Sequence, residues 1–390
     1  MDYSNNLSVL VGNGLSIAFN DELKLDRITK EVVRRISEEA QNGGDVVRTM
    51  QNIASRVERE SVDPNTDFER LVGAFGSESQ SLSYLNYLAT VTSEDEEIKN
   101  ALRASIKFAE KIRDNGISHV LEVIFERSHA SVDKSEKLRN FVTAIYEKFS
   151  GRITYSNLNY DTLLLSALVN LYDSKLVDMG DGRDSRKKKI KPAENLKDIE
   201  CNQLRDGEAD FEGMPTRRLR LLHLHGSLTY WRTLDPEIHV KIATSALREL
   251  EPWAAMRKGE QAIRPDVVLA NPYDKTEHIT NHPFSLCYEM FEKGLKESNK
   301  WLIVGYSFRD EPVNSRLRKE FLSRNEKPTV LVVTFGQSPS RELIEQSLGW
   351  GEEDRISGSS DDWLIIDQGG ANDMELRDEW HIFHSGNPPF

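Results

Sequence analysis

The fold is decided by a short stretch near the N-terminus, Ser8-Val9-Leu10-Val11-Gly12-Asn13-Gly14-Leu15-Ser16. Its apolar first half predicts a buried strand, and its two glycines predict a tight turn that leads into a helix. Such a turn lets the backbone pass close to a phosphate, and the helix offers free N–H groups and the positive end of its dipole. The stretch lacks the full G-x-G-x-x-G spacing of a dinucleotide fingerprint, so an ordinary strand and turn is the alternative interpretation.

Length and composition limit the classes of protein to consider. The chain has 390 residues, of which 38% are hydrophobic, and length alone suggests about two domains. A net charge of −13 argues against a broad duplex-DNA footprint, so direct nucleic-acid binding is not indicated. The two cysteines, Cys201 and Cys287, are too few for a four-ligand zinc site, and we expect no metal. The sequence shows neither a signal peptide nor a membrane-spanning run, so we expect a soluble, cytoplasmic protein without membrane contact.

The order of apolar patterns indicates the architecture. From residue 21 to residue 149 the apolar residues recur at helical spacing, as in Leu25–Glu39, and no convincing strand interrupts them. After residue 150, short apolar strands alternate with helices, which is typical of a parallel sheet covered on both faces. We therefore predict an α/β fold: a Rossmann-like parallel sheet with helices on both faces, formed by residues 1–20 and 150–390. Residues 21–149 form a large all-helical insertion domain after the first strand.

One segment of the second half is strongly polar. Residues 173–210 carry a basic cluster at 186–191 and few apolar residues, so we predict an exposed loop there, or a partly disordered insertion. A solvated loop tip is the preferred interpretation of the basic cluster over a nucleic-acid patch.

Polar motifs follow several of the predicted strands. In open parallel sheets, ligands bind beyond the carboxyl ends of the strands. Three such motifs lie far down the chain: Asn159-Tyr160-Asp161, His225-Gly226-Ser227 and Gly305-Tyr306-Ser307. We expect these three and the first glycine turn to meet at one edge of the sheet.

The order of these four motifs, with Arg264-Pro265-Asp266-Val267-Val268, resembles that of the sirtuin family over residues 1–20 and about 150–340. The resemblance implies that the glycine turn opens an NAD site, that the Asn-x-Asp motif reaches the nicotinamide ribose, and that the His-Gly motif supplies a catalytic histidine. It implies two groups of site residues: for catalysis Asn159, Asp161 and His225, and for NAD binding Gly12, Asn13, Gly14, Ser16, Gly226, Ser227, Gly305 and Ser307.

The chain departs from sirtuin deacylases in two places that serve the protein substrate. It cannot supply their four-cysteine zinc module, and Leu269-Ala270-Asn271-Pro272-Tyr273 stands where they have Phe-Gly-Glu. The chain is therefore more similar to the sirtuin-like NADases of bacterial anti-phage defence, in particular to the sirtuin-like subunit that works with a HerA-type ATPase. This resemblance implies NAD as the substrate, no zinc, a homo-oligomer, and a hexameric HerA-type ATPase or helicase as partner.

The chemistry suits these residue types. Cleavage of the nicotinamide–ribose bond passes through an oxocarbenium-like sugar, and the positively charged nicotinamide leaves readily, so orientation matters most. We expect Asn159 to hold a ribose hydroxyl or the attacking water, His225 to act as general base, and Asp161 to orient one of these groups. Asp161 also suits the N-cap of the helix near Thr162, whereas His223 is the better candidate for a structural histidine. A helix N-terminus explains Asp310 equally well.

Three functions remain open on the sequence alone. The preferred one is NAD hydrolysis to nicotinamide and ADP-ribose, which depletes NAD in abortive infection. The alternatives are an NAD or ADP-ribose sensor without turnover and, less favoured, an NAD-dependent protein deacylase. Because a constitutive NADase would kill its own cell, we expect activation by assembly or by a partner. The helical block and the aromatic-bearing C-terminal tail are the candidates for subunit contacts.

Overall fold

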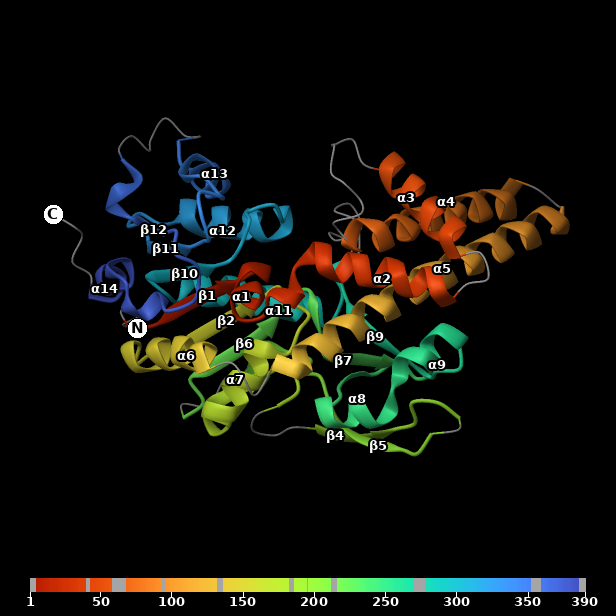
Figure 1. Ribbon diagram of the computed structural model, residues 1–390, viewed down its shortest axis with the longest axis horizontal. Coiled ribbons are helices and arrows are strands. Elements are labelled where there is room, and N and C mark those ends of the chain that lie inside the picture. The colour runs from red at the N-terminus through yellow and green to blue at the C-terminus, as the bar shows by residue number, and fades with distance from the viewer. Residues whose placement is uncertain are drawn as a thin grey trace.

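A computed structural model describes ten segments of the chain (Figure 1). They are residues 5–39, 43–57, 68–92, 95–131, 136–181, 186–194, 196–211, 216–269, 278–351 and 359–385. Tyr273 and Asp274, at the end of the Arg-Pro strand motif, lie outside the described residues. Within these segments no helix combines the length and the apolar character needed to cross a membrane.

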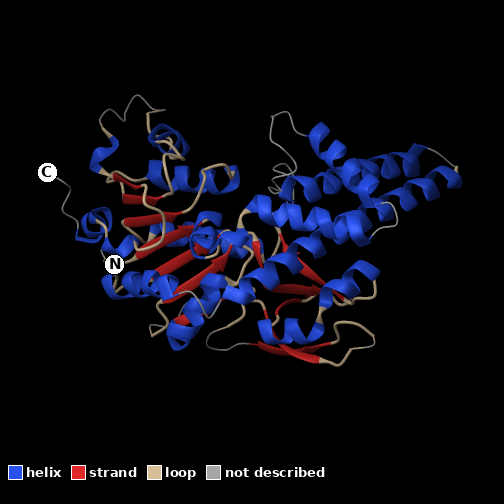
Figure 2. Cartoon of the chain, viewed as in Figure 1, coloured by secondary structure: helices blue, strands red, loops and turns tan. Residues whose placement is uncertain are grey.

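The centre of the molecule is a seven-stranded parallel sheet (Figure 2). Strand β1 lies in its middle, between β10 and β2, and the strands are almost completely buried. This confirms the predicted Rossmann-like α/β class. In spatial order the strands are β12 (Leu364–Asp367), β11 (Thr329–Val333), β10 (Lys300–Val304), β1 (Leu7–Val11), β2 (Ile153–Asn157), β6 (Leu219–His223) and β3 (Leu176–Asp178).

The register of the sheet aligns the ends of its central strands. Val11 pairs with Val304 on one side and with Asn157 on the other, and Asn157 pairs with His223. Val304 in turn pairs with Val333. Because all these strands run in the same direction, the segments that follow them leave from one edge, as the motif positions predict.

Two hydrophobic clusters cover the two faces of the sheet. Alternate residues of each strand enter different clusters, as Leu302 and Ile303 do on β10. One face is covered by α6 (Glu136–Lys148), α7 (Leu163–Tyr172) and α14 (Asp378–Ser385). The other is covered by α11 (Phe284–Lys296), α12 (Glu311–Ser323) and α13 (Arg341–Ser347).

The segment after the first strand is helical wherever it is described, as predicted. It follows the short helix α1 (Asn13–Phe19) and consists of η1 (Asp21–Leu23), α2 (Leu25–Glu39), α3 (Gly43–Val57), α4 (Phe68–Thr92), α5 (Glu96–Ser131) and α6. Helices α4 and α5 together form a hairpin that extends from the body (Figure 1). Helix α6 packs against α7 and shares the core of the sheet.

The prediction of an exposed loop over residues 173–210 is wrong. This segment contains β3, β4 (Arg186–Ile190) and β5 (Ile199–Gln203), and the last two belong to a five-stranded antiparallel sheet. The basic side chains of β4 are exposed as expected, but main-chain pairing with β5 needs no apolar side chains, so composition did not reveal it. The other strands of this second sheet are β8 (His239–Lys241), β7 (Gly226–Thr233) and β9 (Ile263–Val267), and α8 (Thr244–Leu250) and α9 (Pro252–Lys258) lie between β8 and β9.

Two glycine turns interlock at the carboxyl edge of the parallel sheet. The N–H of Gly12 donates to the carbonyl of Val304, and the N–H of Gly14 donates to the carbonyl of Gly305, both at 2.9 Å. A Cβ on Gly14 would lie 2.5 Å from the Cα of Gly305, and one on Gly305 would lie 2.4 Å from the amide nitrogen of Leu15. The turns after β1 and β10 can therefore meet only where both lack side chains.

We predict that Gly305→Ala lowers the free energy of unfolding by about 3 kcal/mol or more, because it adds a backbone clash to the cost of a positive φ. Gly336→Ala is the matched control, since Gly336 also has a positive φ (77° against 61°) but open space around its Cβ position. The control should lose only about 1–2 kcal/mol. Urea denaturation of both variants measures the difference, and equal losses would contradict the interlock.

Candidate functional site

A buried polar network joins the turns after β1 and β2. The amide nitrogen Nδ2 of Asn159 donates to the carbonyl of Gly12 at 3.0 Å and to Oγ of Ser16 at 2.9 Å. Oγ of Ser16 donates in turn to Oδ2 of Asp161 at 2.5 Å. The structure thus brings together four of the predicted site residues, and all three side chains are buried.

Local hydrogen bonds explain why the chain turns this way after β2. Oδ1 of Asn157 accepts from the backbone N–H of Asn159 at 3.1 Å, which fixes the turn that carries the site amide. Oδ1 of Asp161 accepts from the N–H of Leu163 at 2.9 Å at the start of α7. Asp161 therefore satisfies the helix N-terminus with one oxygen and faces Ser16 with the other. Burial raises the pKa of Asp161, although these two hydrogen bonds favour its ionised form.

His223 has the structural role that the sequence suggested. Its ring is fully buried, and Nδ1 lies 3.3 Å from Nδ2 of Asn157, the side chain that fixes the turn before Asn159. Nδ2 carries only donor hydrogens, so Nδ1 is the acceptor and the proton of the neutral ring is on Nε2. Burial, helped by the positive charge of Lys241, lowers the pKa of His223 to about 3. The ring therefore stays neutral and supports the turn.

His225 contacts an acid. Its Nε2 is 3.2 Å from Oδ2 of Asp310, and both side chains are less than a tenth exposed. Nε2 makes no hydrogen bond to the described residues, so the contact is a close electrostatic pair. Oδ1 of Asp310 also accepts from the N–H of Val313 at 3.2 Å, so the N-cap interpretation is correct too. The sequence did not reveal the pairing with His225.

Gly226 and Ser227 make contacts within the protein. Gly226 has a φ of 91°, and a Cβ there would lie 2.2 Å from the carbonyl oxygen of Asp266 on β9. Oγ of Ser227 lies 3.0 Å from Oγ1 of Thr229 and accepts from the N–H of that residue. Close packing of β7 on β9 accounts for this glycine, and the serine points into a buried hydrogen-bonded position.

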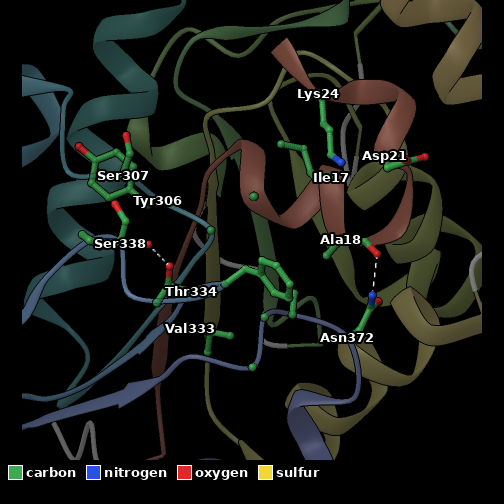
Figure 3. A pocket seen from close by; sticks show the side chains of 17 residues that line it. Ile17, Ala18, Asp21, Lys24, Tyr306, Ser307, Val333, Thr334, Ser338 and Asn372 are labelled. Carbon is green, nitrogen blue, oxygen red and sulfur yellow. Dashed lines mark hydrogen bonds between the residues drawn. The ribbon is translucent and has the colours of Figure 1, made fainter. Parts of the chain in front are cut away.

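A pocket of about 530 Å³ opens at the edge formed by the turns after β1, β10, β11 and β12 (Figure 3). Three predicted residues line it: Gly14, Gly305 and Ser307. The sequence analysis missed most of the rest, which include Lys24, Thr334, Phe335, Ser338 and Asn372. Their positions directly after β11 and β12, or after α1, are the signal that would have found them.

A second, much smaller cavity lies on the other side of the first glycine turn. It measures about 50 Å³ and is lined by Asn13, Asn159 and Asp161, together with residues of η1, α2, α4 and α5. The hydroxyl of Tyr160 lies 2.9 Å from Oε1 of Glu69 on α4 and 2.9 Å from the carbonyl of Val268. The helical insertion therefore covers the Asn159 side of the site. His225 lines neither of these two cavities.

The described segments contain no group of three or more His, Cys, Asp or Glu side chains that could hold a metal ion.

Comparisons with known proteins add little beyond this geometry. No family model matches the chain, and no curated protein matches it. The chain is similar to a solved structure described as "The Structural basis of Sirtuin Substrate Affinity", with 10% sequence identity and a TM-score of 0.36 over 98% of this chain and 95% of that one. We therefore derive the function from the residues of the chain itself.

We predict that His223 makes stability fall as the pH is lowered through its titration range. The folded-state pKa of about 3 lies below the ordinary value of 6.5, so between these values the unfolded chain binds more protons than the folded one. His223 therefore contributes stability that is present above pH 6.5 and is lost at about 1.4 kcal/mol per pH unit on acidification below it.

Urea denaturation of wild type and His223→Gln from pH 7 downward checks this. The free energy of unfolding of wild type minus that of His223→Gln should decrease as the pH falls, whatever the value of this difference at pH 7. His381→Gln, at an exposed histidine, is the control for the substitution itself. A constant difference for His223→Gln would show that folding does not shift the pKa of this ring.

Proposed function

We propose that the carboxyl edge of the parallel sheet binds NAD and that the protein hydrolyses its nicotinamide–ribose bond. The observation that carries this proposal is the buried network of Asn159, Ser16 and Asp161 next to the first glycine turn: Asn159 and Asp161 line the small cavity, and Gly14 of the turn lines the nucleotide-sized pocket. The reaction consumes one water and gives nicotinamide, ADP-ribose and a proton.

The larger pocket fits the adenosine and phosphate part of such a substrate. Its volume of about 530 Å³ is in the range of small-molecule sites. Phe335 is 88% exposed beside it and offers a ring face on which a base can stack. Lys24 extends toward it (Figure 3), and among the described residues its ammonium group has no ion-pair partner. Gly14 and Gly305 contribute to the lining of the same pocket.

Asn159 is the residue we assign to the nicotinamide ribose. Its Nδ2 is held by Gly12 and Ser16, which fixes the orientation of the amide. Its Oδ1 makes no hydrogen bond to the described residues, so it can accept one from a ribose hydroxyl or from the attacking water. Asp161 holds Ser16 and thereby the amide, which makes it a positioning residue.

His225 is the residue we assign as general base. A carboxylate 3.2 Å away, that of Asp310, stabilises the imidazolium that forms when His225 takes the proton of the attacking water or of a ribose hydroxyl. The low exposure of both side chains strengthens this electrostatic support. The ring of Tyr160 lies near His225, with the two ring centroids 6.5 Å apart.

The structure also suggests why the enzyme needs a trigger. A cavity of about 50 Å³ beside Asn159 can hold a water molecule or two but not a pyridine ring. Turnover therefore requires the helical insertion to move away from Asn159. We propose that assembly of several copies, or binding of a HerA-type ATPase, brings this about, and that the resulting loss of NAD serves anti-phage defence. The closed cavity equally favours the alternative of an NAD or ADP-ribose sensor without turnover.

We predict that the purified protein releases nicotinamide and ADP-ribose from NAD, alone or with a HerA-type ATPase, and that Asn159→Ala and His225→Ala each reduce release about 100-fold or more. Chromatography of the products measures this, with the exposed His381→Ala as control. Bound NAD without release under every assembly condition would favour the sensor. Release that survives both substitutions would place the chemistry elsewhere, and a requirement for an acylated peptide would indicate a deacylase.

We predict that Phe335→Ala raises KM for NAD about 10-fold with little change in kcat, because base stacking contributes about 1–3 kcal/mol and acts far from the bond that breaks. Phe335→Tyr keeps the ring and should restore KM. Leu376→Ala is the control, since Leu376 is also exposed, at 73%, but does not line the pocket. An unchanged KM for Phe335→Ala would contradict stacking of the base on this side chain.

A further inference from the structure

A cleft lies between helix α5 of the insertion and helix α9, which pack against each other (Figure 1). Its volume is about 310 Å³. Residues of α5 form one wall, and residues of α9, of β9 and of the turn after β7 form the other. We call it the α5–α9 cleft. It shares no lining residue with the large pocket or with the small cavity beside Asn159, so it is separate from the NAD site proposed above.

The charge of this cleft is opposite to that of the whole chain. Five of its lining residues are basic and two are acidic, whereas the chain has a net charge of −13. A multivalent anion is therefore attracted to this place on a molecule that otherwise repels it. The basic residues are Lys107 and Lys111 of α5, Arg257 and Lys258 of α9, and Arg264 of β9.

Three of these basic side chains have no acidic partner. Among the described residues, the ammonium groups of Lys107, Lys111 and Lys258 form neither a hydrogen bond nor an ion pair. The carboxylate of Asp114, one of the two acids of the cleft, already lies 3.6 Å from the guanidinium of Arg264. Lys107 and Lys111 are one helical turn apart, and like charges at this spacing repel each other. A bound anion would offset that repulsion.

The ordinary interpretation of such lysines is that water solvates them, and Lys258 also suits the C-terminus of α9. Two other lysines on helices of the insertion are arranged differently. Lys30 lies 3.4 Å from Asp26, and Lys99, on α5 itself, lies 2.9 Å from Glu96, in each case an acid about one turn away. Unpaired ammonium groups on both walls of one cleft are therefore a local feature, and they favour a ligand over solvation alone.

The remaining lining residues indicate the class of ligand. Leu234, which is 45% exposed, and the buried Met256 provide apolar surface for a ring. Asn115 makes no hydrogen bond to the described residues and offers an amide to a polar ring atom. The volume is at the lower end of the range of small-molecule sites, about 300–1,000 Å³. Ammonium groups with apolar and amide groups beside them suit a compact polyphosphate that carries a base.

We propose that the α5–α9 cleft binds a nucleoside polyphosphate. The phosphates lie between Lys107 and Lys111 on one wall and Lys258 on the other, and the base contacts Leu234 and Met256. The ligand thereby bridges the helical insertion and the segment that holds the second sheet. This proposal does not rest on NAD hydrolysis, since no residue of the cleft takes part in it.

Titration calorimetry of the full chain with ATP tests the proposal. The wild type should bind ATP, and Lys111→Glu and Lys258→Glu should each weaken binding at least ten-fold, because a charge-assisted contact to phosphate becomes a repulsive one. Lys188→Glu is the matched control, since Lys188 is exposed on β4 within the basic cluster at 186–191 but lines no part of the cleft. It should leave the affinity unchanged. An equal loss in this control would indicate non-specific attraction and overturn the proposal.

Photolabelling with 8-azido-ATP locates the site even if a charge-reversal variant folds poorly. The label should appear in peptides of α5, of α9 or of the turn after β7, and excess ATP should remove it. Phe335→Ala, in the large pocket, should leave this labelling unchanged. Label confined to the turn after β11 would place ATP in the large pocket and overturn the proposal. A wild type that binds no ATP, or that binds inorganic tripolyphosphate as tightly as ATP, would also overturn a nucleotide site here.

Discussion

The close contact between the turns after β1 and β10 sets the geometry of the whole carboxyl edge. The backbones of Gly14 and Gly305 are in direct contact, and a side chain on either residue would prevent this approach. This contact fixes where α1 begins, and therefore where Ser16 stands relative to the turn after β2. In this contact the N–H of Gly14 donates to the carbonyl of Gly305. The same turn therefore joins two strand ends and lines the large pocket. The fold and the candidate site share one constraint.

The polar network at this edge is buried and is held together by its own hydrogen bonds. Asn159, Ser16 and Asp161 each donate or accept within it, and Oδ1 of Asn159 is left without a hydrogen bond to the described residues. The raised pKa of Asp161 shows that burial is unfavourable for its charge. Apolar packing on both faces of the sheet offsets this cost. A costly buried network at a strand-end cavity, with one acceptor of Asn159 open to a ligand, is more consistent with a site than with a purely structural role.

The sequence predicted the sheet well because its strands are buried on both faces and read as continuous apolar runs. The turns after β1, β2 and β10 were recognisable from local chemistry, since glycine, Asn and Asp have specific backbone roles there. The sequence did not predict strand β4 of the second sheet, because its lysine-rich segment is held in place by main-chain pairing with β5 and not by apolar side chains. The pair of His225 and Asp310 was also hidden, because residues so far apart in the chain meet only through the register of the sheet. Phe335 and Lys24 can be recognised as pocket residues only from the positions at which the neighbouring elements end.

Helix α4 ties the helical insertion to the candidate site. Near its N-terminus Glu69 contacts the hydroxyl of Tyr160, the residue between Asn159 and Asp161. Phe68 and Glu69 also line the small cavity beside Asn159. The position of this helix therefore sets both the size of that cavity and the surroundings of the turn after β2, so the insertion and the parallel sheet form the site together.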